Sequence, residues 1–229
     1  MKTILAKVVI VSLTSFLCLF VSCKKDKETE VFSCDPEINT WAHNHLKEVQ
    51  SISFDAICQL TLDKQKAAYR ATNPETRLSL WKEKLSKLLE LQWKPGERHH
   101  IELLMSFLKL SHFTSPDNID IIKEHQERDA FFKTWLFYGT QKLGWSPKLI
   151  KSMVMVLNFQ SNNGKLTEEP IERLTDNVVP GKDCTCSTES DFCGTLGSCK
   201  GSLTCSQALG CGFFWTYICD GDCKLGIHD

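Results

Sequence analysis

The stretch CTCSTESDFC, residues Cys184–Cys193, opens a tail whose composition differs from that of the rest of the chain. Eight cysteines fall between Cys184 and Cys223, whereas only four lie in the 183 residues before them. The eight are Cys184, Cys186, Cys193, Cys199, Cys205, Cys211, Cys219 and Cys223. A segment of roughly 40 residues buries too little apolar surface to offset its chain entropy. The even number of cysteines therefore predicts a small module, residues 183–229, that disulfides stabilise.

Zinc binding is the rival explanation for clustered thiols. Structural zinc sites usually use C-x2-C pairs, whereas this tail contains C-x-C and C-x3-C spacings and a single histidine, His228. The run Asp220-Gly221-Asp222 lacks the remaining ligands of a calcium loop. We therefore expect no metal site and no cofactor. The disulfide connectivity stays open, because spacing alone does not decide it.

The N-terminus has the features of an export signal. Lys2 and Lys7 precede or flank an apolar run that extends from Val8 to Val21, about 14 residues. A helix needs roughly 20 apolar residues to span a bilayer, so a signal peptide over residues 1–22 fits better than a membrane anchor. Export would place the mature chain in an oxidising compartment, where disulfides persist.

A cysteine directly follows this apolar run. Ser22-Cys23 resembles the end of a bacterial lipobox, although Phe20 stands where leucine is usual, and the charged stretch KKDKETE comes next. Cys23 would then be the lipidated first residue, and residues 23–34 a charged spacer similar to the tethers of Bacteroidota-type surface lipoproteins. We expect an exported lipoprotein of the outer membrane or cell surface, anchored to the membrane by its lipid. Ordinary cleavage and free secretion is the alternative.

Residues 35–158 have the pattern of a helical bundle. Pairs of a capping residue and a proline mark helix starts, because the side-chain oxygen accepts from a free N–H and proline lacks an N–H that would have no partner. The pairs are Asp35-Pro36, Asn73-Pro74, Ser115-Pro116 and Ser146-Pro147. Helices are expected near 36–49 and 61–71, after Asn73, across Ile101–Leu108, from Asp117 to near Gly139 or Gly144, and from Pro147 to Val156.

The segment after Asn73 shows the helical periodicity well. Its apolar residues recur every three or four positions and share one face: Leu78, Trp81, Leu85, Leu88 and Leu89. Pro95-Gly96 is expected to end this helix. About six helices are enough to close one core. The expected fold class is mainly α, with an N-terminal bundle of about six helices, a linker over residues 159–182, and the disulfide-rich C-terminal module.

The bundle offers little that points to catalysis or to nucleic-acid binding. No metalloprotease, nucleophile-elbow or phosphate-loop motif occurs, and we expect its histidines to lie on solvated helix faces. Without residues 1–22, 25 basic residues face 28 acidic ones, so no basic footprint for nucleic acid remains. Cys34 and Cys58 are candidates for one additional disulfide, the alternative being two separate buried cysteines.

The tail contains one dense apolar patch, GFFWTYI, between Cys211 and Cys219. Its large side chains are Phe213, Phe214, Trp215, Tyr217 and Ile218. A module this small does not bury both faces of such a strand internally. The patch is therefore a candidate surface for binding a target, with docking on the helical domain as the alternative.

The tail resembles fulvocin C, a small cysteine-rich bacteriocin, over residues 183 to about 223. The resemblance lies in CTCSTESDFC and the following CGTLGSCKGSLTCSQALGCGFFWTYIC. With CDPEINTW and YRATNPETRLSLWKEKL upstream, the chain is similar to the bacteriocin fulvocin C-related proteins. This resemblance implies an antibacterial polypeptide made as the C-terminal part of a precursor. Only the cysteines and their immediate neighbours carry over, and the lipobox and the residues after Cys219 depart from the pattern.

These features together predict a non-enzymatic exported protein whose module acts by binding and is released by proteolysis to antagonise other bacteria. The tail carries six acidic residues and two lysines, which argues against attack on anionic lipid and favours a bacterial envelope protein or glycan as the partner. An adhesive or receptor-binding surface lipoprotein without antibacterial activity is the alternative. An enzyme is a further alternative, for which no nucleophile–base or paired-carboxylate arrangement is visible.

Overall fold

A computed structural model describes residues 30–115, 119–168, 183–190, 197–202 and 207–225. Within these residues the chain is mainly α-helical, with short strands and disulfides in its C-terminal region. The predicted fold class is therefore confirmed. The predicted signal peptide, the lipidated Cys23 and most of the predicted linker lie outside the described residues.

The described residues contain eight α-helices and one 3-10 helix before the C-terminal region. The α-helices are α1 (Pro36–Asn44), α2 (Leu46–Gln50), α3 (Phe54–Cys58), α4 (Leu62–Ala71), α5 (Pro74–Leu89), α6 (Pro95–Phe107), α7 (Ile119–Gln141) and α8 (Pro147–Val154). The 3-10 helix η1 (Leu110–Phe113) connects α6 to α7. The two five-residue helices, α2 and α3, account for the excess over the expected number, and α3 occupies a stretch where no helix was predicted.

The capping pairs act as the sequence predicts at three of the four positions. The side chains of Asp35, Asn73 and Ser146 accept hydrogen bonds from backbone N–H groups in the first turns of α1, α5 and α8. The fourth pair is not testable, because Pro116 lies outside the described residues. The prediction that Pro95-Gly96 ends the helix after Asn73 is corrected: α5 ends at Leu89, and Pro95 begins α6 at the first helical position, where proline is well tolerated.

Lys84 on α5 stabilises the end of α8 from inside the core. Its side chain is fully buried, and its Nζ donates to the carbonyl oxygens of Ser152, at 2.7 Å, and Val156. These carbonyls lie at the C-terminus of α8, where backbone acceptors lack helical partners and a positive charge is favourable. The ammonium also lies 5.4 Å from the centre of the Trp81 ring.

Within the described residues the strands form three small antiparallel pairs. The hairpin of β1 (Ser161–Asn162) and β2 (Lys165–Leu166) turns at Asn163 and Gly164, which both have positive φ. In the C-terminal region β3 (Gly197–Gly201) pairs with β6 (Gly221–Leu225), and β4 (Ala208–Cys211) pairs with β5 (Tyr217–Cys219). The short 3-10 helix η2 (Phe213–Trp215) connects β4 to β5.

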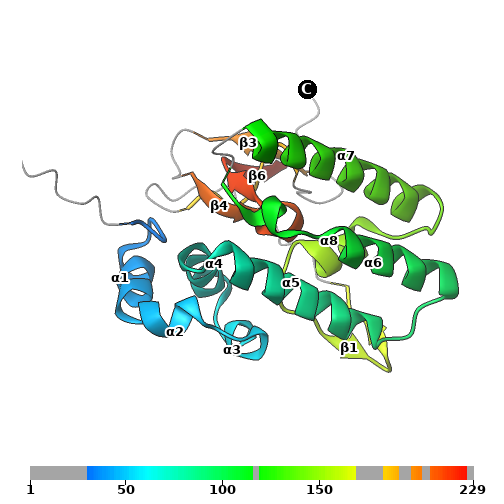
Figure 1. Ribbon diagram of the computed structural model, residues 1–229, viewed down its shortest axis with the longest axis horizontal. Helices are drawn as coiled ribbons and strands as arrows, with labels where there is room; N and C mark the ends of the chain where they lie inside the picture. The colour runs from blue at the N-terminus through cyan, green and yellow to red at the C-terminus, as the bar shows by residue number, and fades with distance from the viewer. Residues whose placement is uncertain (1–29, 116–118, 169–182, 191–196, 203–206, 226–229) are drawn as a thin grey trace, which may run out of the picture. The chain divides into compact units, whose positions relative to one another are not determined.

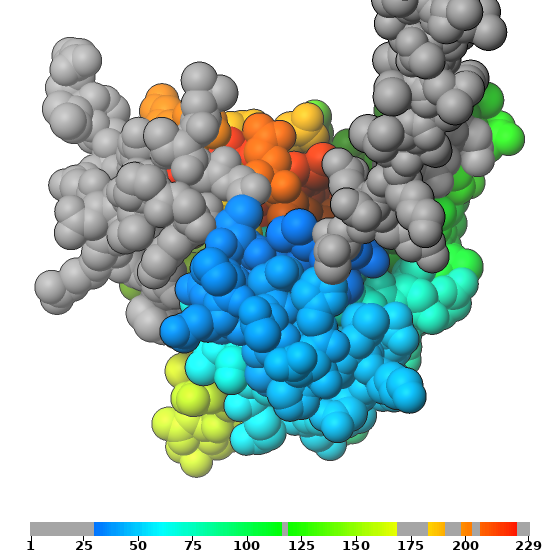
Figure 2. Space-filling view, turned by 90° about the vertical axis from the view of Figure 1, so that its left-hand side faces the viewer, coloured from blue at the N-terminus to red at the C-terminus, as the bar shows by residue number. Residues whose placement is uncertain are grey.

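The helices and the C-terminal region share one hydrophobic core. The cluster of buried side chains runs from Phe32 through the helices and includes Phe213, Phe214, Trp215 and Tyr217. Figure 1 accordingly shows β4 close to α4. In Figure 2 the blue N-terminal residues meet the orange and red C-terminal ones in a continuous surface. The module beginning at Asp183 is therefore packed into the helical part of the chain.

Among the described residues, no helix has both the length and the apolar character that crossing a membrane requires.

The N-cap of α5 provides a direct test of how this framework is stabilised. Replacing Asn73 with alanine removes the acceptor for the Thr76 N–H, at 2.8 Å, and we expect a loss of about 1 kcal/mol in the free energy of unfolding. Urea denaturation followed by circular dichroism measures this loss. Asn73→Asp is the matched control, because aspartate caps as well as asparagine does. Equal stability of the alanine variant and the native protein would contradict this role.

Candidate functional site

The aromatic patch of the tail is inserted into the core of the helical part. Phe213, Phe214, Trp215 and Tyr217 are all buried, with exposed fractions of 4%, 0%, 1% and 7%, whereas Ile218 is 56% exposed. Four of the five candidate target-binding side chains are therefore inaccessible in this structure. In the structure the patch docks on the helical domain, which is the alternative stated above. We call residues Gly212–Tyr217 the aromatic plug.

Rings from three helices surround the plug. Trp81 of α5 makes edge-to-face contacts with Phe214, at 5.1 Å between ring centres, and with Trp215, at 5.7 Å. Tyr69 of α4 meets Trp215 edge-to-face at 5.3 Å, and Phe132 of α7 stacks on Phe213 at 5.0 Å. Edge-to-face and stacked pairs of this kind add about 0.5–1.5 kcal/mol each beyond the area that they bury.

Three hydrogen bonds, each donated by the polar group of an aromatic side chain, hold the plug in place. Tyr69 donates its hydroxyl to the Phe214 carbonyl oxygen at 2.9 Å, and Trp215 Nε1 donates to the Met155 carbonyl oxygen at 2.8 Å. The Tyr217 hydroxyl donates to Asp129 Oδ1 at 2.6 Å. Burial raises the pKa of both tyrosines, so each hydroxyl is a protonated donor at neutral pH.

The backbone of the plug lies in an unusual conformation. Phe214 and Trp215 have φ of 55° and 54°, in the left-handed region that bulky residues rarely adopt. Gly212 before them has φ of 67°, and a Cβ at this position would lie 2.7 Å from atoms of Ser190 and Tyr217. Glycine is therefore required there, and the surrounding contacts must hold the two aromatic residues in their conformation.

Disulfides close the module around the plug. Cys211 pairs with Cys219 across β4 and β5, directly bracketing the plug, and Cys186 pairs with Cys199. Cys184 and Cys223 are also disulfide-bonded. Cys193 and Cys205 lie outside the described residues. The prediction of a disulfide-rich module is confirmed, and because the Cys211–Cys219 bond is buried, it forms part of the interior beside the plug.

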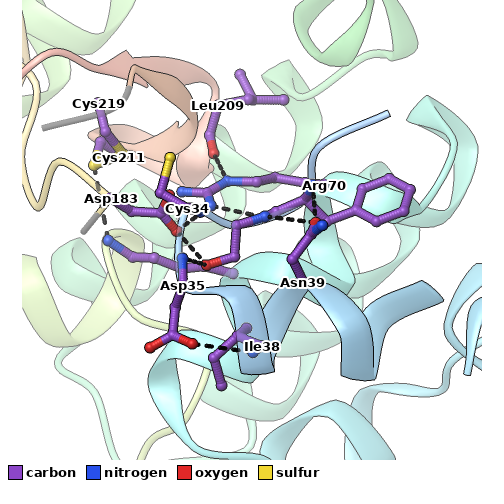
Figure 3. Close-up of polar contacts among 12 residues, drawn as sticks. Cys34, Asp35, Ile38, Asn39, Arg70, Asp183, Leu209, Cys211 and Cys219 are labelled. Atoms are coloured by element: carbon purple, nitrogen blue, oxygen red, sulfur yellow. Dashed lines mark hydrogen bonds and ion pairs between the residues drawn. A yellow bond between two sulfur atoms is a disulfide. The ribbon is translucent and has the colours of Figure 1, made fainter. Parts of the chain in front are cut away.

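Arg70 of α4 joins the start of the module to the helical part (Figure 3). Its guanidinium is buried and donates to Asp183 Oδ2 at 2.6 Å, to the Leu209 carbonyl oxygen at 2.6 Å and to the Phe32 carbonyl oxygen at 2.9 Å. One side chain thus contacts the segment before α1, the first residue of the module and strand β4. We call Arg70 and Asp183 the Arg70–Asp183 ion pair.

Further donors hold the Asp183 carboxylate from the N-terminal side. The Cys34 backbone N–H donates to Oδ1 at 2.8 Å, and the Ser33 hydroxyl donates to Oδ2 at 2.9 Å. Burial alone would raise the pKa of Asp183, but the Arg70 guanidinium and these donors together lower it below its ordinary value. The carboxylate is therefore ionised at neutral pH and stabilises the docked module.

Cys34 and Cys58, the candidates for one additional disulfide, are not paired: both are half-buried free thiols, which corresponds to the alternative of two separate cysteines. Cys34 lies in the segment before α1, where its backbone is bound to Asp183, and Cys58 ends α3, where its carbonyl oxygen accepts from Asn158. The two are therefore fixed on separate elements. Burial raises the pKa of the Cys58 thiol to about 11, so it is a weak nucleophile at neutral pH.

Two histidines differ from the expected solvated position. The His100 ring stacks on Trp135, with an angle of 2° between the planes, and its Nε2 donates to the Trp135 carbonyl oxygen at 2.9 Å. His112 is also buried, and burial lowers its pKa to about 4. Both belong to the packing between α6, η1 and α7. The part of the chain that the structure describes contains no group of three or more histidine, cysteine or carboxylate side chains that could hold a metal ion.

Sequence reasoning missed the residues of the helical part that receive the plug. Tyr69 and Arg70 lie on α4, a helix of polar composition, and Asp129 is one of many charged residues on α7. A weak signal existed in the small residues Ala67, Ala68 and Ala71 of α4, which are compatible with close approach of another segment. Neither the hydrophobic periodicity nor the composition of α4 identifies which distant residue packs against these alanines.

Comparison with known proteins does not identify the chain: no family model, no curated protein and no solved structure matches it.

The Tyr69 hydroxyl tests whether the plug is held as described. Tyr69→Phe keeps the ring but leaves the buried Phe214 carbonyl oxygen without its donor, and we expect a loss of about 1–3 kcal/mol in the free energy of unfolding. Tyr138→Phe is the matched control, because its side chain is about half exposed at 47%. Urea denaturation followed by tryptophan fluorescence compares them. Equal effects of the two substitutions would rule out a buried bond at Tyr69.

The Arg70–Asp183 ion pair predicts a contribution to stability that depends on pH. Because the folded pKa of Asp183 lies below its ordinary value of about 3.9, this contribution is complete above that value and is lost as the pH falls through the folded pKa. Asp183→Asn should lower stability at neutral pH by about 2 kcal/mol, because hydrogen bonds to charged groups are worth roughly that much. Its difference from the native protein should shrink at acidic pH.

Thermal unfolding of both proteins between neutral and strongly acidic pH measures this convergence. Asp220→Asn is the matched control within the module, because Asp220 binds Thr188 in an exposed position. A difference between Asp183→Asn and the native protein that stays constant over the whole pH range would contradict the assignment.

Proposed function

We propose that this is an exported bacterial protein in which the helical part holds a disulfide-stapled, bacteriocin-like module in a covered state. The module acts on other bacteria by binding an envelope protein or glycan after proteolysis between the two parts. The helical part and the lipid anchor keep the module at the producing cell until the module dissociates. No catalytic step forms part of this proposal.

The observation that carries the proposal is the burial of the aromatic plug. Phe214 and Trp215, the apolar side chains most suited to contact a target, are 0% and 1% exposed, so the docked module presents Ile218 as the exposed member of the patch. Large aromatic residues dominate the energetics of most binding surfaces. Covering them silences a binding module without any chemical modification.

The charge of the module also supports a binding role. With six acidic residues and two lysines in residues 183–229, the module does not favour anionic lipid. The disulfides would maintain its shape after release, because they act within the module and do not depend on the helices. The similarity to fulvocin C over this region agrees with such a role.

A second candidate function is favoured by the same shared core. If the module is never released, the plug is simply part of the permanent hydrophobic core. Asp183 also joins the module to Arg70 and to the segment before α1. In this candidate the protein is a surface lipoprotein with an adhesive or receptor-binding role. The module then remains attached throughout the life of the protein.

Growth inhibition tests the antibacterial proposal. A specific protease site is introduced within residues 169–182 of the mature protein, the chain is cut, and the C-terminal fragment is isolated under denaturing conditions with its disulfides intact. We expect the oxidised fragment to inhibit some strain of a bacterial panel, and the intact protein and the reduced, alkylated fragment to be inactive. If no strain responds to the oxidised fragment, the antibacterial role is wrong.

Mass spectrometry of producing cells and their medium separates the two candidates. The antibacterial candidate predicts a cut chain: a fragment that begins near Lys182 or Asp183, held with the cells or found in the medium, and a lipidated remainder that begins at Cys23 in the cells. The surface-lipoprotein candidate predicts a single cell-bound chain that extends from Cys23 to Asp229. The same spectra report whether Cys23 carries a lipid.

A further inference from the structure

We infer that the helical part is a non-covalent binding partner of the module, so that cutting the chain between them does not release it. The inference deepens the proposed function and rests on it for its biological meaning, since it makes the helical part a reversible inhibitor. The ligand is the disulfide-closed module of this chain, supplied either by the same copy or by a second copy.

The contacts that hold the module lie at its first residue and in the segment from Leu209 to Tyr217. Asp183 binds Arg70 at the beginning, and Tyr217 binds Asp129 near the end, where the Arg128 guanidinium also lies 4.5 Å from the tyrosine ring centre. Trp215 binds Met155 between them. None of these residues belongs to the stretch 169–182, so a cut there removes none of these bonds.

Separation of the parts would expose surface that is fully covered in the intact protein. Phe214 and Trp215 would enter water, and Tyr69 would leave a carbonyl oxygen for which it is the buried donor. The Arg70 guanidinium would lose its carboxylate partner and the Leu209 carbonyl oxygen together. Each loss disfavours the separated state, and all of them occur in the same step, so dissociation should be slow.

Recapture should be favourable because the module is already shaped. The Cys211–Cys219 disulfide closes the segment that carries the plug, and Gly212 permits its turn at φ of 67°. A preorganised ligand loses little conformational entropy on binding. The helical part would therefore bind a module from another copy by the same contacts as its own.

The experiment uses the mature protein with a specific protease site within residues 169–182. After complete cutting, confirmed by non-reducing denaturing electrophoresis, the sample is passed through a size-exclusion column at micromolar concentration and neutral pH. We expect both fragments to elute together at the volume of the uncut protein. Elution of the module by itself, immediately after the cut, would overturn the inference.

Exchange between copies tests binding in trans. Cut protein carrying an isotope-labelled module is mixed with unlabelled cut protein, and native mass spectrometry follows the exchange of modules. We expect slow exchange to a mixed population, with Tyr69→Phe at least tenfold faster and the control Ile218→Ala within twofold of the native rate, because Ile218 is exposed. Tyr217→Phe, which loses the bond to Asp129, serves if Tyr69→Phe does not fold.

These readouts are separate from growth inhibition. Coelution with no effect on any bacterium would support the inference and reject the antibacterial role, whereas an active fragment that leaves the helical part at once would do the reverse. Equal exchange rates for the native protein and for the Tyr69 and Tyr217 variants would show that the plug does not hold the module.

Discussion

The structure depends on the insertion of Phe214 and Trp215 into the centre of the helical part. Burying two such side chains contributes about 1.5–3 kcal/mol each, whereas holding two bulky residues at positive φ costs about 1–3 kcal/mol each. The two effects are of similar magnitude. The balance therefore comes from the other contacts of the plug: the edge-to-face rings of Tyr69 and Trp81, the stacked pair of Phe132 and Phe213, and the three hydrogen bonds, two of them buried.

The module and the helical part consequently bury apolar surface for each other. The module is too small to cover its own aromatic segment, and the helices surround a space that this segment fills. The Cys211–Cys219 disulfide and the turn at Gly212 shape the segment. The Arg70–Asp183 ion pair holds the first residue of the module against α4. The sequence suggests a helical bundle and a separate disulfide-stabilised module, and the positions of the disulfides agree with that division. The hydrophobic core does not, because residues of both parts form it.

Much of the helical framework follows from local rules, and the site does not. The caps at Asp35, Asn73 and Ser146 begin helices where the sequence predicts them, because capping depends on residues a few positions apart. Cysteine number predicts a disulfide-rich tail for a similar reason. The hydrogen-bond partners of the plug lie 60 to 145 residues away in the sequence, and no periodicity records such pairings. The free thiols of Cys34 and Cys58 make the same point, since only the fold determines their separation.

Native-state hydrogen exchange of the mature, uncut protein measures the central claim most directly. If the plug is part of the helical core, peptides that cover residues 211–219 and peptides from the middle of α5 should exchange at similar, slow rates, because both become exposed only when the common core opens. Rapid exchange of residues 211–219 beside a protected α5 would contradict the account, because it would mean that the module folds and moves independently of the helices.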